Sequence, residues 1–218
     1  MKEALALYGR ALADAAATSG PAGPLVRFED GELMPFPVAR YLAPADQLEQ
    51  RLLDGVRGPV LDIGCGPGRH LRALNARGVE ALGLDLSPVA VAIARQSGGA
   101  AIVGDVFGAV PGAGRWRTAL LLDGNIGIGG DPAALLTRVA SLLHPNGVAL
   151  VELDPPGSRT QPARARIELA GERSGWFAWA RVAAREATAV AAAANMSIER
   201  EWSCGQRWFA RFRSRACD

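Results

Sequence analysis

The amino-acid sequence predicts an α/β fold with a doubly wound, mostly parallel sheet. Short apolar runs alternate with helical stretches from residue 58 onward, an order typical of parallel strands with helices on both faces. The runs lack a clean alternation of apolar and polar residues, which indicates strands buried on both sides. Five such strands are expected, over residues 60–63, 81–84, 101–103, 119–122 and 147–153.

Helices are expected between these strands, and a different pattern follows the fifth strand. The connecting helices are predicted over residues 70–77, 88–96 and 132–143. Residues 154–174 are rich in proline, glycine and arginine, which predicts a long loop near the site. An alanine-rich helix is expected over residues 176–194. Residues 196–201 and 206–213, separated by the turn Cys204-Gly205, predict an antiparallel hairpin.

The first 57 residues predict a helical extension that precedes one globular domain of residues 58–218. Apolar residues recur at the spacing of an amphipathic helix over residues 1–19. The proline-rich stretch 20–43 is expected to be irregular, with a short hairpin around Asp30-Gly31. A second helix is expected over residues 44–56, opened by Pro44 and Asp46.

The composition is that of a soluble globular chain. The 218 residues are 49% hydrophobic and 21% charged, with a formal net charge of +2. This balance argues against a nucleic-acid partner, which a strong basic excess would accompany. No apolar run is long enough to span a membrane, and the N-terminus has no clean apolar core of a signal peptide. Cys65, Cys204 and Cys217 make no disulfide framework and suit a reducing cytosol, so a cytoplasmic protein is expected.

The strongest motif is a glycine loop between the first strand and the first helix of the domain. Such a loop lets the backbone approach a ligand beside the free N–H groups of a helix. A dinucleotide would need G-x-G-x-x-G, but the third glycine of that pattern is replaced by Arg69. The alternative is a shorter G-x-G-x-G loop with an acid just before it. Asp62, Gly64, Gly66 and Gly68 match that alternative.

Val60-Leu61-Asp62-Ile63-Gly64-Cys65-Gly66-Pro67-Gly68 closely resembles the first motif of the class I S-adenosylmethionine-dependent methyltransferases. The resemblance covers about residues 58–213. It implies a Rossmann-like sheet of seven strands with an antiparallel last strand, which the C-terminal hairpin matches. It also implies that Asp62 and the loop residues hold the amino-acid end of the cofactor, through Gly64, Cys65, Gly66 and Gly68.

Two further acids stand at the ends of the next two strands. Asp85 follows the loop by about 20 residues, where a carboxylate accepts both ribose hydroxyls; it also suits a dinucleotide or a simple helix cap. Leu86 comes directly after it and is assigned to the cofactor with it. The resemblance assigns Asp105 to the adenine amino group and Val106 to the side of the ring. The alternative for Asp105 is a structural role in turning the loop.

Candidate acceptor-side residues follow the fourth strand. In this fold, ligands bind outside the carboxyl ends of the strands, so Asp123 and Asn125 point towards the methyl group and the acceptor. Asp123 is the best-placed candidate base by topology, although it also suits cofactor contact or loop support. His70 is either a catalytic candidate or a partly buried helix residue. Arg40 and Tyr41 belong either to a lid over the cofactor or to a packed linker.

The function expected from these residues is methyl transfer to a small-molecule acceptor such as a bacterial secondary metabolite. Metal assistance is not expected, because Asp154-Pro155-Pro156 stands where the catechol-type enzymes carry an Asp-Asn pair. Two alternatives stay open. One is an NAD(P)-dependent oxidoreductase, which Arg69 and the final hairpin disfavour. The other is a methyltransferase-like module that binds without catalysis. The oligomeric state is left open, and neither nucleic acid nor a membrane is expected as a partner.

Overall fold

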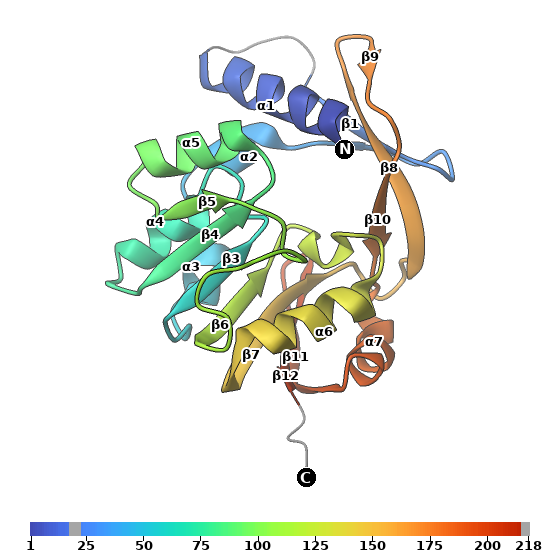
Figure 1. Ribbon diagram of the computed structural model, residues 1–218. Coiled ribbons are helices and arrows are strands. Elements are labelled where there is room, and N and C mark those ends of the chain that lie inside the picture. The colour runs from blue at the N-terminus through green and yellow to red at the C-terminus, as the bar shows by residue number, and fades with distance from the viewer. Residues whose placement is uncertain (18–22, 215–218) are drawn as a thin grey trace.

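The computed structural model describes residues 1–17 and 23–214, which build two sheets and the helices around them (Figure 1). The larger sheet has seven strands in the order β11-β12-β7-β6-β3-β4-β5. Its strands are β3 (Val60–Ile63), β4 (Ala81–Asp85), β5 (Ala101–Val103), β6 (Trp116–Leu121), β7 (Leu143–Leu153), β11 (Met196–Cys204) and β12 (Arg207–Ser214). The five strands β3 to β7 pair with their neighbours in parallel, and β12 pairs antiparallel with both β7 and β11. The predicted fold class is confirmed, including the C-terminal hairpin.

Helices cover both faces of the seven-stranded sheet. One face packs against α3 (Gln47–Leu53), α4 (Arg69–Asn75) and α5 (Pro88–Gln96), and the other against α6 (Pro132–Leu142) and α7 (Ala187–Ala193). On β6, Ala119 and Leu121 face the α6 side, whereas Leu120 faces the α4 side. This explains why the strands are apolar throughout rather than alternating.

The starts of α5 and α6 each combine a capping side chain with a proline. The Ser87 side chain accepts a hydrogen bond from the Ala90 N–H and precedes Pro88, and Asp131 does the same for Ala134 before Pro132. A capping side chain satisfies an N–H that has no partner inside the helix, and proline suits the first turn. These two helices therefore begin where a cap meets a proline.

The second sheet is antiparallel and joins distant parts of the chain. Its order is β10-β8-β1-β2, with β9 paired to β8. The strands are β1 (Leu25–Phe28), β2 (Leu33–Pro35), β8 (Gln161–Leu169), β9 (Glu172–Arg173) and β10 (Phe177–Arg181). Figure 1 shows β8 and β10 running beside the seven-stranded sheet, with α1 (Lys2–Ala17) above. The hairpin expected around Asp30-Gly31 is the β1–β2 hairpin.

Two sequence-based expectations about this region are wrong. The loop predicted over residues 154–174 contains β8 and β9, and the long helix predicted over 176–194 is β10 followed by the short α7. In β8, Ala165, Ile167 and Leu169 are buried, with charged residues between them. That is the period-2 alternation of a half-buried strand. Pairing of β10 with β8 prevails over the helix propensity of its alanines.

The N-terminal segment packs against the rest of the chain. Leu7 and Leu12 of α1 share an apolar cluster with Ala90 of α5 and Ile167 of β8. The stretch predicted to be irregular also contains a short helix, α2 (Val38–Leu42). The expected first helix extended to residue 19, and its last two positions lie outside the described residues. In the described part of the chain, no helix has the length and apolarity to cross a membrane.

Candidate active site

A cavity of about 480 Å³ lies at the carboxyl ends of the parallel strands. One half is walled by the loops after β3, β4 and β5, and the other by α1, α2 and the second sheet. This is the crevice in which open α/β sheets bind their ligands. We call the first part the loop half and the second part the sheet half.

The glycine loop has a backbone that only glycine adopts without strain. Gly64, Gly66 and Gly68 have φ angles of 70°, 53° and 82°. A Cβ atom on Gly66 would lie 3.1 Å from the hydroxyl oxygen of Tyr8, which comes from α1. The loop therefore presents bare backbone to the cavity with the α1 side chain close above it. Gly68 stands further back, since it begins α4 and packs against Ala94.

Asp62 and Cys65 are buried around this loop. Asp62 is 1% exposed at the end of β3, beneath the loop rather than on the cavity wall. Cys65 lines the cavity, and its Sγ lies 3.6 Å from the carbonyl oxygen of Gly66. Burial raises the pKa of the Cys65 thiol far above its usual range, with a contribution from Asp62. The thiol stays protonated, which suits a packing role in the turn.

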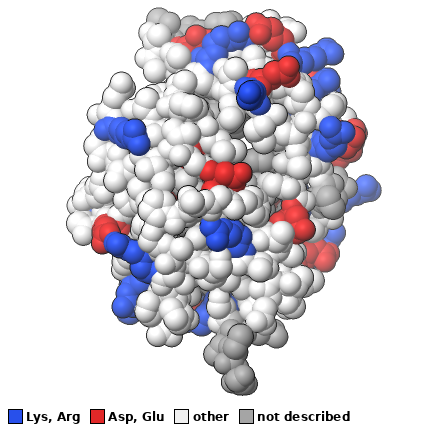
Figure 2. All heavy atoms as spheres, viewed as in Figure 1, with Lys and Arg blue, Asp and Glu red and all other residues white. Residues whose placement is uncertain are grey.

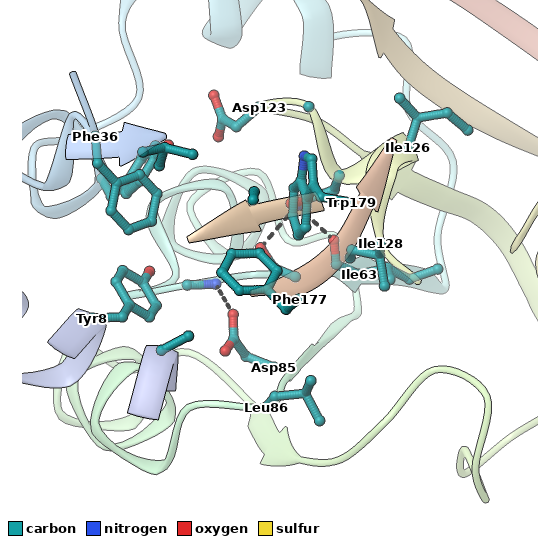
Figure 3. A pocket seen from close by; sticks show the side chains of 18 of the residues that line it. Tyr8, Phe36, Ile63, Asp85, Leu86, Asp123, Ile126, Ile128, Phe177 and Trp179 are labelled. Carbon is teal, nitrogen blue, oxygen red and sulfur yellow. Dashed lines mark hydrogen bonds between the residues drawn. The ribbon is translucent and has the colours of Figure 1, made fainter. Parts of the chain in front are cut away.

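Asp85 lies at the end of β4 and is hydrogen-bonded directly to the loop. Its Oδ2 accepts the Gly66 N–H at 2.8 Å (Figure 3). Its Oδ1 accepts the Ser87 N–H at 2.8 Å. Burial raises the pKa of Asp85, and the two backbone hydrogen bonds oppose that effect. Each oxygen of a carboxylate has a second lone pair. The carboxyl group is thus fixed in place and still able to accept two further hydrogen bonds.

The residues predicted to flank the adenine also lie on the cavity wall. Leu86 and Val106 line it beside Asp85, with Val106 4% exposed. Asp105 is exposed, and its Oδ1 accepts the Phe107 N–H at 3.0 Å. That bond turns the loop, so the structural role weighed for Asp105 is present in the geometry. Its role towards adenine stays a prediction.

Asn125 is used to hold the glycine loop. Its Nδ2 donates to the carbonyl oxygens of Ile63 at 2.9 Å and Gly64 at 3.0 Å. A Cβ on Gly64 would meet this amide at 2.6 Å, so the two groups are in close contact. The structure brings Asn125 to the predicted place and gives it a positioning contact there.

Asp123 belongs to a group of paired charges that we call the arginine–carboxylate cluster. The cluster comprises Arg40, Glu49, Arg69, Asp123, Glu152 and Arg207. Asp123 accepts from Arg69 Nη2 at 2.5 Å and 2.7 Å, and its own N–H donates to Glu152 at 2.7 Å. Its φ of 56° is in the left-handed region. The predicted base is therefore held by a guanidinium rather than standing free.

Glu49 lies at the centre of this cluster and is 1% exposed. Its Oε1 accepts from Arg40 at 2.7 Å, Arg69 at 2.7 Å and Arg207 at 3.0 Å. Burial raises the pKa of Glu49, but the opposing effects of His70, Arg69 and the Asp46 backbone N–H are larger and hold the pKa well below its usual range. The carboxylate joins α2, α3, α4 and β12 behind the cavity wall, on which two of its partners, Arg40 and Arg69, lie.

Sequence reasoning did not find Glu49, Glu152 or Arg207. Glu49 is the third residue of α3, where it also completes a capping box with Asp46, and that pattern indicates only a helix start. One signal was present in the sequence, the arginine at the position of the missing glycine, Arg69. In the structure Arg69 is 3% exposed, and its Nε has no hydrogen-bond partner within the described residues.

His70 is buried between two carboxylates. Its Nδ1 lies 3.8 Å from Asp62 Oδ2, and its Nε2 lies 3.9 Å from Glu49 Oε1. These separations are ion-pair contacts, too long for hydrogen bonds. Burial lowers the pKa of His70, but the opposing effect of Asp62 and Glu49 is larger and raises the pKa to about 9. The imidazole is charged at neutral pH, which does not suit a general base.

We expect this histidine to make folding stability depend on pH. Its pKa of about 9 in the folded state exceeds the ordinary value, so its stabilisation is complete below about pH 6.5 and is lost as the pH rises to 9. The loss is about 3 kcal/mol at most. The free energy of unfolding of the wild type, measured in urea, should fall as the pH rises over this range. His70→Gln should remove most of this dependence on pH. His144→Gln, which changes the other histidine, should keep it; equal slopes in wild type and His70→Gln would contradict the assignment.

Comparison with known proteins decides the family. A model of the family described as methyltransferase domain matches residues 38–181, more than half of the chain. The chain belongs to this methyltransferase family. Membership confirms the predicted enzyme class and its cofactor, S-adenosylmethionine, and leaves the nicotinamide alternative without support.

Individual relatives of the methyltransferase agree with this. The trans-aconitate 2-methyltransferase of Paracidovorax citrulli is 27% identical over 137 residues, which is 61% of this chain and 52% of that protein. The chain thus matches about half the length of this relative. The crystal structure of an S-adenosylmethionine-dependent methyltransferase from Bacteroides fragilis, in complex with S-adenosyl-L-homocysteine, has a TM-score of 0.78 at 23% identity. It covers 95% of this chain and 94% of that chain.

A Burkholderia thailandensis 1,6-didemethyltoxoflavin-N1-methyltransferase is more distant. Its structure has a TM-score of 0.58 at 17% identity, covering 77% of each chain. At such identities these two likenesses establish a shared fold. The family match covers Arg69, Asp85, Asp123 and strands β8 to β10 of the second sheet, but it begins after α1, β1 and β2.

Proposed function

We propose that this methyltransferase transfers the methyl group of S-adenosylmethionine to a small-molecule acceptor. One observation carries the proposal. A single cavity runs from Gly66 and Asp85 in the loop half, past Asp123, to Phe177 and Trp179 in the sheet half. Cofactor and acceptor can therefore meet inside one cavity at the ends of the parallel strands.

The loop half fits the cofactor. Gly64 and Gly66 leave backbone bare for its amino-acid end, and Asp62 lies directly beneath them. Asp85 has lone pairs to spare for two ribose hydroxyls. Leu86 and Val106 supply the apolar sides of an adenine pocket. S-adenosylmethionine supplies a methyl group already activated by its sulfonium, so the protein has only to orient and enclose the reactants.

We assign positioning roles to the residues at the end of β6. Asn125 holds the loop through Ile63 and Gly64, and Asp123 is fixed by Arg69 and the backbone bond to Glu152. These contacts fix the glycine loop and the start of α4 relative to the end of β6. For His70, a buried charged group between Asp62 and Glu49, we propose support of the loop rather than proton transfer.

The covering of the cavity favours a small acceptor. Strands β8 and β10 and helix α1 stand over the strand ends, where a macromolecule would need open access. On the face seen in Figure 2, basic and acidic side chains are interspersed, without the single-sign area that nucleic acid needs. The arginine-rich, lysine-poor composition supports a bacterial origin, and the three cysteines suit a cytoplasmic location. We further propose an acceptor from bacterial secondary metabolism.

A turnover assay would test the proposal. The protein is incubated with S-adenosylmethionine and a library of small acceptors, and S-adenosylhomocysteine formation is measured beside calorimetric binding of the same product. We expect binding together with transfer to at least one compound. Binding of S-adenosylhomocysteine without transfer to any compound would favour the non-catalytic module, and binding of NAD instead would overturn the assignment.

A further inference from the structure

The sheet half of the cavity is lined by aromatic rings. Six of the chain's aromatic residues face it, including both tyrosines: Tyr8, Phe28, Phe36, Tyr41, Phe177 and Trp179. They come from α1, α2, β1, β10 and the segment after β2. Segments far apart in the sequence therefore converge to place rings around one space.

Four of the rings form one pair in the N-terminal segment and one pair on β10 (Figure 3), and Tyr41 also contacts Phe36 with ring centroids 5.7 Å apart. Tyr8 and Phe36, from the N-terminal segment, have ring centroids 5.3 Å apart. Phe177 and Trp179, from β10, have centroids 6.2 Å apart at 87°, an edge-to-face arrangement. Both separations fall in the range of favourable aromatic contact. We call these two groups the N-terminal ring pair and the β10 ring pair.

The β10 ring pair is anchored close to the end of β6. Trp179 bridges to Ile128, and a Cβ on Gly127 would meet the indole Nε1 at 2.6 Å. The indole therefore rests against the backbone that follows Asp123. Side chains fixed in this way are preorganised. Stacking of a ligand on them therefore costs the protein little conformational entropy.

Charges at this end of the cavity are paired with one another. Asp123 pairs with Arg69, Glu152 with Arg207, and Asp154 with Arg181 at 2.9 Å. Arg40 pairs with Glu49. Burial raises the pKa of Tyr8 and Tyr41, so both phenols stay neutral. Within the described residues, a polycarboxylate or a cationic amine bound here would therefore meet only charged side chains that already have an ionic partner.

We infer that the acceptor is an uncharged, planar aromatic molecule held between the N-terminal and β10 ring pairs. This inference rests on the proposed function and names its substrate class. Aromatic faces recognise a flat apolar ring by stacking and edge contacts. The paired charged side chains can still form a hydrogen bond with a single hydroxyl or amine on that ring.

Calorimetry with 2-naphthol as the probe, on protein saturated with S-adenosylhomocysteine, tests this. We expect 2-naphthol to bind the wild type. Trp179→Leu and Phe36→Leu should each weaken it on the order of tenfold, with affinity for S-adenosylhomocysteine within about twofold of wild type. Trp202→Leu is the matched control: Trp202 stacks on Phe209 in the C-terminal hairpin, and its loss should leave 2-naphthol binding unchanged.

Each outcome bears on a defined claim. Tighter binding of trans-aconitate or tetramethylammonium than of 2-naphthol would overturn the aromatic class, as would 2-naphthol binding that ignores both Trp179→Leu and Phe36→Leu. If S-adenosylhomocysteine itself fails to bind, the proposed function fails. If it binds while 2-naphthol does not, the proposed function stands and only the substrate class falls.

Discussion

Asp85→Ala is expected to bind S-adenosylhomocysteine at least tenfold more weakly than the wild type. Its carboxylate is fixed by the N–H groups of Gly66 and Ser87 and keeps two lone pairs for the ribose hydroxyls. A hydrogen bond to a charged group is worth about 1.5–3 kcal/mol, and about 1.4 kcal/mol corresponds to a factor of ten in affinity. Losing two such bonds, with water as a partial substitute, gives tenfold as the lower bound. Isothermal titration calorimetry measures it directly.

The controls separate ribose contact from loosening of the loop. Asp85→Asn keeps one carbonyl oxygen and should fall between the wild type and Asp85→Ala. Asp131→Ala removes the cap of α6 outside the cavity. It should lower stability by about 1 kcal/mol and leave affinity unchanged. Unchanged affinity in Asp85→Ala would show that the ribose assignment is wrong.

Glu49→Ala is expected to lower the free energy of unfolding by about 3–5 kcal/mol. Removing one partner from a buried ionic group leaves the remaining charges without compensation, and that cost is of this size. Here the carboxylate is 1% exposed, and Arg40, Arg69 and Arg207 all donate to it. Urea unfolding followed by circular dichroism measures the loss.

Glu80→Ala is the matched control, because Glu80 also pairs with an arginine, Arg115, but its side chain is 64% exposed. We expect it to cost less than about 1 kcal/mol. Acid provides a second test. The pKa of Glu49 is lowered on folding, so its stabilisation is present above its ordinary value of about 4.3 and is lost as the pH falls. Glu49→Ala should therefore lose less stability in acid than the wild type does; equal losses would contradict this role.

The loop half of the cavity was predictable because its signals are local. A strand, a glycine loop and an acid at the next strand end lie within short stretches, so the positions of residues 60–68 and Asp85 in the fold could be predicted from the sequence. The sheet half is built by distant pairings. The alternation in residues 163–169 marked β8, but neighbouring prolines and glycines favoured a loop, and alanines favoured a helix over β10.

The arginine–carboxylate cluster was hidden for a related reason. Glu49 and Arg207 contact each other across 158 positions, and nothing in either local pattern points to the other. Asp123 and Asn125 were placed at the correct end of β6 by topology. Their partners, Arg69 and the carbonyl oxygen of Gly64, depend on side-chain directions that only the folded structure gives.

The pairing of β1 with β8 has a consequence for synthesis on the ribosome. Arg27 and Glu168 contact each other across 141 positions, so the first strand must wait for a partner made much later. At roughly 5–20 residues per second, that wait is on the order of ten seconds. The five parallel strands β3 to β7 are complete by residue 153, earlier than β8. The nascent chain can therefore assemble the parallel strands around the loop half of the cavity before it can complete the sheet half.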